Sequence, residues 1–339
     1  MTIIILSDGY KGGTSKFLEN FIINNLKNKI NKIILIDKSP KKTFANLKKN
    51  SLLKIYKQDV LKNKKTAIKI FSKYIDEQPT FFFTNYAFLV IYFYFFFSKS
   101  AKLAITLHSG IFVNNLKVIL ATTLFSIMSL KINFLIFGSN SSKLWWFSHF
   151  PWMRLVNNKV IYNGIDPGFY KKKNDKKFRI SFVGRLEVEN NPSLFLELSL
   201  LNKKNKNLIF NVFGNGSLKQ ELSIKNNNVK FWGWSDLSKI YSNTDITIIT
   251  APLNNFPYTA LESQSFGKPV ITCSKGDIRK IITNSVNGYY FNEPNVLIFN
   301  KYLFKTILNY DFLSKNSYKN SKKFNLNHSC KRILSFIKN

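Results

Sequence analysis

The feature that most constrains this chain is a repeated order of short β-branched run, glycine-bearing turn and amphipathic helix. Its first copy predicts a strand at Thr2–Leu6, a turn at Ser7–Thr14, a helix at Phe17–Lys29 and a second strand at Lys32–Ile36. Strands that alternate with helices in this way build parallel sheets, because each crossover helix packs back onto the sheet. Further strands are predicted at residues 80–84 and 103–107.

The second half of the chain repeats the alternation with clearer turns. Predicted strands at Phe178–Val183 and Leu208–Phe213 each end in a glycine turn that precedes a helix, and strands follow at Ile246–Thr250 and Pro269–Thr272. A chain of 339 residues is long for one hydrophobic core and suits two domains. The sequence therefore predicts an α/β protein with two Rossmann-like halves.

Composition indicates where the halves divide. Residues 163–177, NGIDPGFYKKKNDKK, are polar and rich in turn formers, as linkers between domains are. We expect an N-terminal domain over residues 1–165, a linker over 166–177, a C-terminal domain over 178–310 and a basic helical tail over 311–339.

One apolar stretch, residues 81–97 (FFFTNYAFLVIYFYFFF), has about the minimum length of a tilted transmembrane helix. Thr84 and Asn85 interrupt it, and its front has the pattern of a buried parallel strand. The favoured interpretation is a strand, a turn and then a buried or membrane-leaning helix over Phe88–Phe97. A membrane-spanning helix is the alternative.

Charge and cysteine content bear on partners and compartment. The chain has 51 Lys and Arg against 18 Asp and Glu, a net charge of +33. Such a field attracts polyanions, but scattered lysines beside abundant Asn, Ile and Phe equally fit a compositional drift of the genome. No arm or helix concentrates the charge, so no nucleic-acid partner is expected.

The isolated Cys273 and Cys330, and a start without signal-peptide features, favour a reduced, cytoplasmic protein without disulfides.

Three turns follow predicted strands of the second half. They are Gly184-Arg185-Leu186, Gly214-Asn215-Gly216, and residues 254–259 before a helix that carries Glu262. Ligands of open α/β sheets bind beyond the carboxyl ends of the strands, where helix N-termini present N–H groups to phosphate. One glycine turn is a common feature, so the prediction rests on the order and spacing of all three.

Several segments within residues 178–292 resemble the donor-binding half of glycosyltransferase family 4, the group 1 glycosyl transferase domain. They are VGRLEVENNPSLFLEL, FNVFGNGSLKQEL, VKFWGW, NTDITIITAPLNNFPYTALESQSFGKPVI and NGYYF. The first half matches more loosely, through Gly12-Gly13-Thr14, Ser139-Asn140 and residues 106–110 and 163–166. The resemblance implies the GT-B fold, two Rossmann-like domains facing across a cleft with a C-terminal helix that crosses back. It also implies sugar transfer from a nucleoside-diphosphate sugar to an acceptor hydroxyl with retained anomeric configuration.

The resemblance further implies roles for single residues. Arg185 would bind the donor diphosphate, a task that suits the paired donors of a guanidinium. Glu262 would accept hydrogen bonds from ribose hydroxyls, His108 would lie near the transferred sugar, and Gly13 would let the backbone approach a ligand. An exposed arginine, a structural histidine and ordinary turn glycines are the corresponding structural interpretations. The implied catalytic residues are Arg185 and His108, and the implied donor-binding residues are Gly13, Gly184, Arg185, Asn190, Gly214, Asn254, Phe256, Pro257, Tyr258, Thr259 and Glu262.

Two positions depart from the family pattern. A glutamate is usual eight residues before Glu262, where this chain has Asn254, and a lysine is usual where it has Asn190. Asn254 can still accept and donate hydrogen bonds. Asn190 lacks the positive charge that stabilises a departing diphosphate, although Lys219 is a candidate substitute. These changes leave open a poorly active member of the family.

The implied chemistry needs neither a metal nor a cofactor. In the resembled family the departing diphosphate is thought to take the acceptor proton, and the chain has no Asp-x-Asp motif. A saccharide or lipid-linked acceptor in polysaccharide or lipopolysaccharide synthesis is expected. Aromatic and basic residues in Phe88–Lys102 and Trp145–Arg154 suit an anionic membrane surface, so peripheral attachment to the inner face of the cytoplasmic membrane is expected.

Two other classes of function stay open. The first is a different GT-B enzyme, such as an inverting transferase or a sugar-nucleotide epimerase, which the anomer of the product would distinguish. The second is a non-catalytic GT-B protein that binds a membrane or another polyanion, which would show no donor turnover. The base, the sugar and the acceptor do not follow from the sequence.

Overall fold

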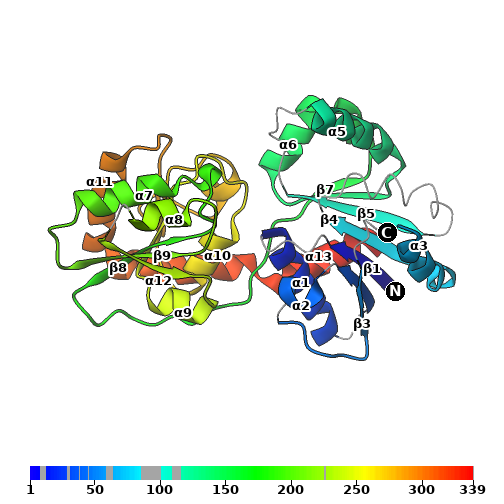
Figure 1. The fold of residues 1–339 in the computed structure, drawn as a ribbon, viewed down its shortest axis with the longest axis horizontal. Coiled ribbons are helices and arrows are strands. Elements are labelled where there is room, and N and C mark those ends of the chain that lie inside the picture. The colour runs from blue at the N-terminus through cyan, green and yellow to red at the C-terminus, as the bar shows by residue number, and fades with distance from the viewer. Residues whose placement is uncertain are drawn as a thin grey trace. The chain divides into compact units, whose positions relative to one another are not determined.

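The computed structural model describes residues 1–7, 13–28, 31–37, 39–44, 46–58, 64–84, 101–108, 116–224 and 227–338. The chain forms two compact units (Figure 1). Unit 1 comprises Met1–Gly164 and Leu326–Asn339, and unit 2 comprises Ile165–Asn325. Each unit holds a parallel sheet with helices on both faces, which confirms the predicted α/β class.

Unit 1 is built on a seven-stranded sheet, counted over the described residues, in the order β3-β2-β1-β4-β5-β6-β7. Every neighbouring pair is parallel. Its strands are β1 (Thr2–Ser7), β2 (Lys32–Asp37), β3 (Leu53–Lys57), β4 (Thr80–Thr84), β5 (Lys102–Leu107), β6 (Phe134–Phe137) and β7 (Asn158–Val160). Its helices are α1 (Gly13–Lys27), α2 (Pro40–Thr43), α3 (Lys64–Ser72), η1 (Ile75–Glu77), α5 (Leu116–Met128), η2 (Ser129–Lys131), α6 (Asn140–His149), η3 (Pro151–Leu155) and α13 (Leu326–Lys338).

The central strands of unit 1 are continuous apolar runs because helices cover both faces of the sheet. Residues 3–6 and 33–36 are buried along their whole length. Figure 1 shows α5 and α6 over one face and α1 and α13 over the other. The predicted strands at 2–6, 32–36, 80–84 and 103–107 are confirmed.

The apolar stretch at residues 81–97 begins as a strand. Thr80–Thr84 forms β4, which pairs with β1 and β5 in the middle of the sheet. The helix expected at residues 88–97 lies outside the described residues. Within the described ranges, no helix combines the length and the hydrophobicity needed to cross a bilayer.

Unit 2 has a six-stranded parallel sheet in the order β10-β9-β8-β11-β12-β13. Its strands are β8 (Phe178–Val183), β9 (Leu208–Phe213), β10 (Val229–Gly233), β11 (Ile246–Ile249), β12 (Val270–Thr272) and β13 (Gly288–Tyr290). Its helices are η4 (Val188–Asn190), α7 (Pro192–Leu201), α8 (Lys219–Ile224), α9 (Leu237–Ser242), α10 (Tyr258–Ser265), η5 (Asp277–Lys280), α11 (Val296–Leu308), α12 (Tyr310–Ser321) and η6 (Lys322–Phe324).

The two sheets share one topology. In each, the first three strands run outward from the centre and the fourth returns to the other side of the first, which is the doubly wound Rossmann order. In unit 2, α7 and α11 bury Phe195 and Phe299 against one face, and α12 buries Tyr310 and Leu313 in the same core. Both halves are therefore Rossmann-like, as the alternation predicted.

The C-terminal region is divided between the units. Helix α12 belongs to unit 2, where Ser314 Oγ donates to the Gly267 carbonyl at 2.6 Å. Helix α13 belongs to unit 1, where Ser329 Oγ donates to the Tyr162 carbonyl at 2.6 Å. The last helix thus returns to the first unit, as the GT-B expectation requires. The division falls at 325/326 rather than at the expected 310/311, because the apolar face of α12 completes the core of unit 2.

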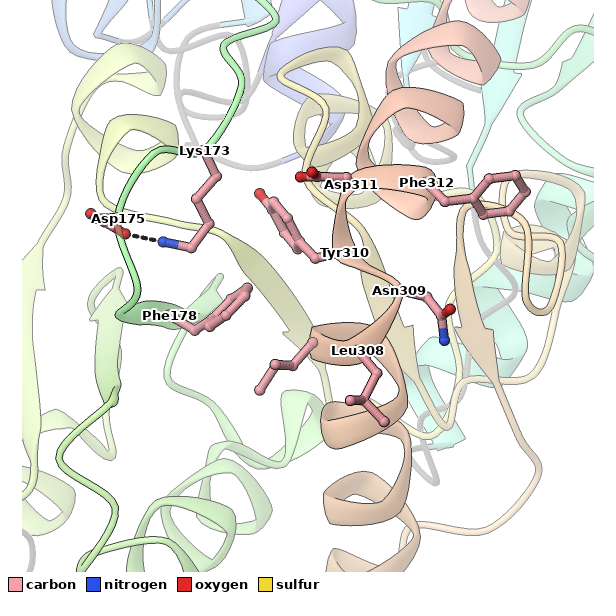
Figure 2. A pocket seen from close by; sticks show the side chains of 9 residues that line it. Lys173, Asp175, Phe178, Leu308, Asn309, Tyr310, Asp311 and Phe312 are labelled. Carbon is pink, nitrogen blue, oxygen red and sulfur yellow. Dashed lines mark hydrogen bonds and ion pairs between the residues drawn. The ribbon is translucent and has the colours of Figure 1, made fainter.

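The segment expected to be a linker, residues 166–177, also belongs to unit 2. Ion pairs hold the segment at the amino edge of the sheet. Lys173 forms one of them with Asp175, beside Phe178 and Tyr310 (Figure 2). The buried Asp245, just before β11, lies 3.6 Å from Lys173 Nζ. These ion pairs join the segment to the sheet.

Asp245 is the centre of this group of ion pairs. Among the described residues, it is the only acidic side chain here that lies within 4 Å of three cationic ones. Its carboxylate lies 3.2 Å from Arg179 Nη1 and 3.8 Å from Lys268 Nζ, in addition to Lys173. It also accepts a hydrogen bond from the Arg179 amide at 2.9 Å. Burial lowers the pKa of Lys268, and the nearby Asp245 carboxylate acts in the opposite direction by favouring the charged ammonium group.

Removal of Asp245 should destabilise unit 2. Asp245→Ala leaves the nearly buried Lys173 and Lys268 without their shared counter-ion, so we expect a loss of about 3–5 kcal/mol in the free energy of unfolding. Urea unfolding measures it, with the exposed Glu293→Ala as control, expected within about 0.5 kcal/mol of wild type. Equal stability of the two variants would contradict the role given to Asp245.

Candidate functional site

The candidate site lies at the carboxyl edge of the sheet in unit 2. Strand order reverses between β8 and β11, and such a reversal opens a crevice where doubly wound sheets bind ligands. Strand β8 leads into Gly184 and Arg185, and β11 leads into Thr250. Two of the three predicted turns therefore flank the reversal, and the third follows the neighbouring β9.

The turns after β8 and β9 are in direct backbone contact. The Gly184 amide donates to the Phe213 carbonyl at 3.0 Å, and the Leu186 amide donates to the Asn215 carbonyl at 3.0 Å. Gly214 has φ +144°, and a Cβ there would lie 1.8 Å from the Gly184 oxygen. A Cβ on Gly216 would lie 2.2 Å from the Leu186 oxygen. The GNG motif is therefore required for the two turns to meet.

Arg185 is on the surface of this edge and is held by an acid. Its Nη2 donates to Glu189 Oε1 at 2.8 Å, and both side chains are about half exposed. An exposed pair of this kind contributes at most about 1 kcal/mol. A phosphate can therefore compete for the guanidinium at small cost.

Asn190, which stands where the family pattern has a lysine, closes the same loop. Its Nδ2 donates to the Arg185 carbonyl at 2.9 Å, and its own carbonyl accepts from Thr250 Oγ1 at 2.8 Å. The side chain shapes the backbone around Arg185 and ties the β8 turn to the end of β11. The structure thus gives Asn190 a positioning role.

The loop after β11 completes the edge. Thr259 Oγ1, in the first turn of α10, donates to the carbonyl of Val183, the residue before Gly184, at 3.4 Å. Asn254 Nδ2 donates to Ser274 Oγ at 3.1 Å, so Asn254 is fixed to the loop after β12. Phe256 packs against Phe324 with ring centroids 5.5 Å apart. Pro257 precedes α10, and Tyr258 is its first residue.

Glu262 lies in α10, one turn beyond Tyr258, and its side chain is 8% exposed. Burial raises the pKa of Tyr241 well above 10, and the charge of Glu262 adds to this effect. The Tyr241 hydroxyl donates to the Thr259 carbonyl at 3.2 Å. Glu262 is thus nearly enclosed. That setting suits a recognition group, since a hydrogen bond gains strength where water is excluded.

Lys219 lies on the GNG side of the edge. Its Nζ donates to Asn215 Oδ1 at 2.8 Å from the first turn of α8. Glu187 accepts from Ser217 N at 3.0 Å and from Ser217 Oγ at 2.5 Å, and these donors lower the pKa of Glu187. The sequence analysis named Lys219 as a substitute for the missing lysine, and the structure places it next to the GNG turn.

The other two predicted residues belong to unit 1. Gly13 is the first residue of α1 and is exposed. His108 follows β5, packs edge-on against Phe17 with centroids 4.8 Å apart, and has its Nε2 buried. Burial lowers the pKa of His108 to about 4, so the imidazole is neutral near pH 7.

Some residues that shape these sites escaped the sequence analysis. A Cβ on Gly138 would come 2.8 Å from His108 Nδ1, so this glycine leaves room for the imidazole. Gly276, with φ +99°, does the same for the Asn254 carbonyl, which would lie 2.6 Å from a Cβ. Glu187 and Thr250 link loops whose contact only the fold reveals. In the sequence, only the spacing of Gly214 and Gly216 indicated that two of these loops lie close together.

A hollow of about 430 Å³ lies elsewhere, at the amino edge of unit 2 (Figure 2). Phe178, Tyr310 and the Lys173–Asp175 pair line it. The one cation of this lining, Lys173, is already paired with Asp175 and lies near Asp245, so it is not free to bind an anionic ligand. Among the described residues, no cluster of three or more His, Cys, Asp or Glu side chains has the arrangement of a metal site.

Part of the chain matches a known protein family. Residues 169–324 match the model of the family described as glycosyl transferases group 1. This part of the chain is therefore similar to group 1 glycosyl transferases. The segment contains the carboxyl-edge loops after β8, β9 and β11, and the match therefore agrees with the resemblance found in the sequence.

Solved structures similar to the chain share the fold over its whole length. HepE from Anabaena, in complex with UDP-glucose, has a TM-score of 0.79 at 15% identity, covering 100% of this chain and 99% of that one. Sucrose-phosphate synthase from Thermosynechococcus elongatus has a TM-score of 0.81 at 12% identity, covering 100% and 98%. The lipopolysaccharide outer core galactosyltransferase WaaB has a TM-score of 0.68 at 16% identity, covering 99% of each chain.

A curated relative matches part of the sequence. It is an uncharacterized 41.2 kDa protein in the cps region of Klebsiella pneumoniae, 24% identical over 148 residues. The match spans 40% of this chain and 41% of the relative's own length.

The neutral state of His108 gives stability a dependence on pH. The unfolded chain takes up a proton near pH 6.5 and the folded chain only near pH 4, so stability falls as pH drops through this range and is insensitive to this group above it. Between pH 7 and 4.5, wild type should lose on the order of 2 kcal/mol more than His108→Gln in urea unfolding.

The control is His149→Gln, which changes an exposed histidine. It should lose stability with acid as wild type does. The same acid sensitivity in wild type and His108→Gln would rule out a buried neutral imidazole at this position.

Proposed function

We propose that this protein is a glycosyltransferase that moves a sugar from a nucleoside-diphosphate sugar to an acceptor hydroxyl with retained anomeric configuration and without a metal. The observation that carries the proposal is the convergence of the loops after β8, β9 and β11, tied together by the Gly184–Phe213, Asn190–Thr250 and Thr259–Val183 hydrogen bonds. The match to group 1 glycosyl transferases over the same loops supports it.

The donor would lie with its diphosphate at this edge. Arg185 and the N-terminus of α10 would bind phosphate oxygens, because both present donors and positive charge beside the strand reversal. Glu262 would accept hydrogen bonds from the ribose, and Asn254 would contact the sugar. HepE has been solved with UDP-glucose and the pneumococcal O-GlcNAc transferase GtfA with UDP and GlcNAc, which favours a nucleoside-diphosphate donor here.

The chemical step would break the bond between the sugar C1 and the terminal phosphate oxygen and form a bond between C1 and the acceptor oxygen. The acceptor proton would pass to the departing diphosphate, so the protein needs no separate base. Its contribution is to stabilise the charge that builds up on the diphosphate, through Arg185, with Lys219 as the nearby second cation. His108, neutral near pH 7, and Gly13 would serve the sugar and acceptor from unit 1.

The acceptor would be a saccharide or a lipid-linked molecule of cell-surface polysaccharide, lipopolysaccharide or glycolipid synthesis. The relatives named for a cps region and for the lipopolysaccharide outer core support this class. Synthesis of this kind would place the protein in the cytoplasm, at the inner face of the cytoplasmic membrane.

One observation favours a second candidate, a GT-B protein that binds a donor without turning it over. The family lysine is absent, and Asn190 in its place is directed at the Arg185 carbonyl. If Lys219 does not reach the diphosphate, the leaving group would lack one of its cations. Binding and turnover therefore need to be measured separately.

A screen of UDP-, GDP- and ADP-sugars should identify the donor. A ligand that binds only the folded state at 100 times its Kd stabilises it by about 2.7 kcal/mol, so one nucleotide class should raise the Tm by about 5 °C or more. Release of the nucleoside diphosphate and NMR assignment of the product anomer then test transfer. Binding without release would support the second candidate, and an inverted anomer would contradict retention.

Matched variants tie the activity to the site. Arg185→Ala should lower kcat/KM about 10²–10³-fold, and Glu262→Gln should weaken donor binding about 10–100-fold, with the fold intact. Glu197→Gln, an exposed carboxylate on α7 in the same unit, is the control and should behave as wild type. Full activity in both site variants would reject the assignment.

The pairing of Arg185 with Glu189 makes a separate prediction. Glu189→Gln removes the acid that competes with phosphate for the guanidinium, so donor Kd should fall about 2–5-fold, with a smaller effect at high salt. Calorimetric titration at two ionic strengths measures it. Weaker donor binding in this variant would show that Glu189 orients Arg185 instead of competing for it.

A further inference from the structure

Helix α5 has the reverse of the pattern expected for a surface helix. The side chains of Leu116, Ile119, Leu120, Leu124 and Ile127, with Leu130 of η2, are between 46% and 71% exposed. Their spacing of three and four residues places them on one face of the helix. A surface helix normally turns such a face toward the core, so six large aliphatic side chains on one outward stripe require an explanation.

The inward face of the same helix is small and hydroxylated. Ala121, Thr122, Ser126 and Ser129 are buried, and Phe125 is the one large side chain among them. The hydroxyls bond within the helix, Thr122 Oγ1 to the Val118 carbonyl at 2.7 Å and Ser126 Oγ to the Thr123 carbonyl at 2.6 Å. The polar groups are satisfied inside and the apolar groups face out. The helix is therefore suited to an apolar environment on its outer side.

Neighbouring elements extend this surface. Helix α6 and η3 lie beside α5, with Phe125 of α5 edge-on to Trp146 of α6 at 5.6 Å (Figure 1). Leu144 and Leu155 are 69% and 83% exposed there. Trp145 stacks on His149 with centroids 4.3 Å apart. Aromatic rings beside exposed leucines are the composition of a membrane-interface surface.

The charged residues in this part of the sequence have one sign. Between Glu77 and Asp166 the sequence contains no acidic residue. Lys131, Lys143 and Arg154 belong to the described elements of this surface, and Lys143 and Arg154 lie over the Phe147 ring at 5.2 and 5.8 Å. An apolar stripe beside elements whose charged residues are all basic is complementary to a layer of hydrocarbon under anionic headgroups.

The length of the stripe shows that this helix is too short to span a bilayer. Residues 116–131 measure about 24 Å at 1.5 Å per residue, less than the roughly 30 Å of a hydrocarbon core. A second copy of the chain is a poorer fit, because a two-fold contact would bring basic residues against one another. A helix of this kind lies in the plane of the interface.

We propose that the outward face of α5 and η2, with Leu144 and Leu155, docks on the surface of an anionic lipid bilayer. Leu116, Ile119, Leu120, Leu124, Ile127 and Leu130 insert among the acyl chains, and Lys131, Lys143 and Arg154 contact anionic headgroups. The inference rests on unit 1 alone and does not depend on the proposed transferase activity.

Flotation of the full chain with vesicles tests the proposal. Vesicles of phosphatidylglycerol and phosphatidylcholine should bind the protein, and vesicles of phosphatidylcholine alone should bind at least 10-fold less. Leu120→Glu/Leu124→Glu should reduce binding to the anionic vesicles at least 10-fold. The control Leu297→Glu/Leu308→Glu, which changes two residues 64% and 82% exposed on α11, should bind as wild type.

Circular dichroism and urea unfolding confirm that each variant is folded, so loss of binding cannot be attributed to unfolding. Equal binding of both double variants would overturn the proposal, as would equal binding to neutral and anionic vesicles. A dimer in light scattering that Leu120→Glu/Leu124→Glu dissociates, without vesicle binding by wild type, would assign the face to a second copy instead. Donor turnover is measured separately, so failure of either proposal is recognised independently.

Discussion

The contact between the turns after β8 and β9 is the constraint on which the site depends. Gly214 and Gly216 lie so close to the Gly184 and Leu186 carbonyls that no side chain fits between them. Parallel strands already direct their carboxyl ends to one edge, but this contact brings the backbones of two loops within hydrogen-bond distance. Arg185, in the first of these loops, owes its position to glycines thirty residues away in the sequence.

The same edge is joined by short polar links. Asn190 connects the β8 turn to Thr250, and Thr259 connects α10 to Val183. The amino edge is held differently, by the buried Asp245 with its three cations. At the amino edge, the charged side chains are held in buried or partly buried ion pairs that stabilise unit 2. At the carboxyl edge, Arg185 forms only a solvent-exposed ion pair with Glu189, which an anionic ligand can replace. This division is what makes the carboxyl edge the better candidate for binding an anion.

Local sequence patterns predicted the helices and strands well. They did not predict which elements contact one another in the folded chain. The runs at residues 2–6, 178–183 and 208–213 are apolar and β-branched, so their strand character is visible in the sequence. The tail was harder to divide, because the sequences of α12 and α13 do not say which of the two cores each helix covers. Gly138 gave no signal, since its effect on His108 depends on strands β5 and β6 being neighbours. The exposure of α5 was hidden for the same reason: hydrophobicity in a sequence does not say which side of a helix faces the protein.

Hydrogen–deuterium exchange with and without a nucleoside diphosphate tests the central claim most directly, because it maps where the ligand acts on the intact chain. The account predicts slower exchange in residues 184–190, 214–218 and 254–262, the loops of the carboxyl edge of unit 2. Protection confined to residues 173–178 and 307–312, around the hollow at the amino edge, would contradict it.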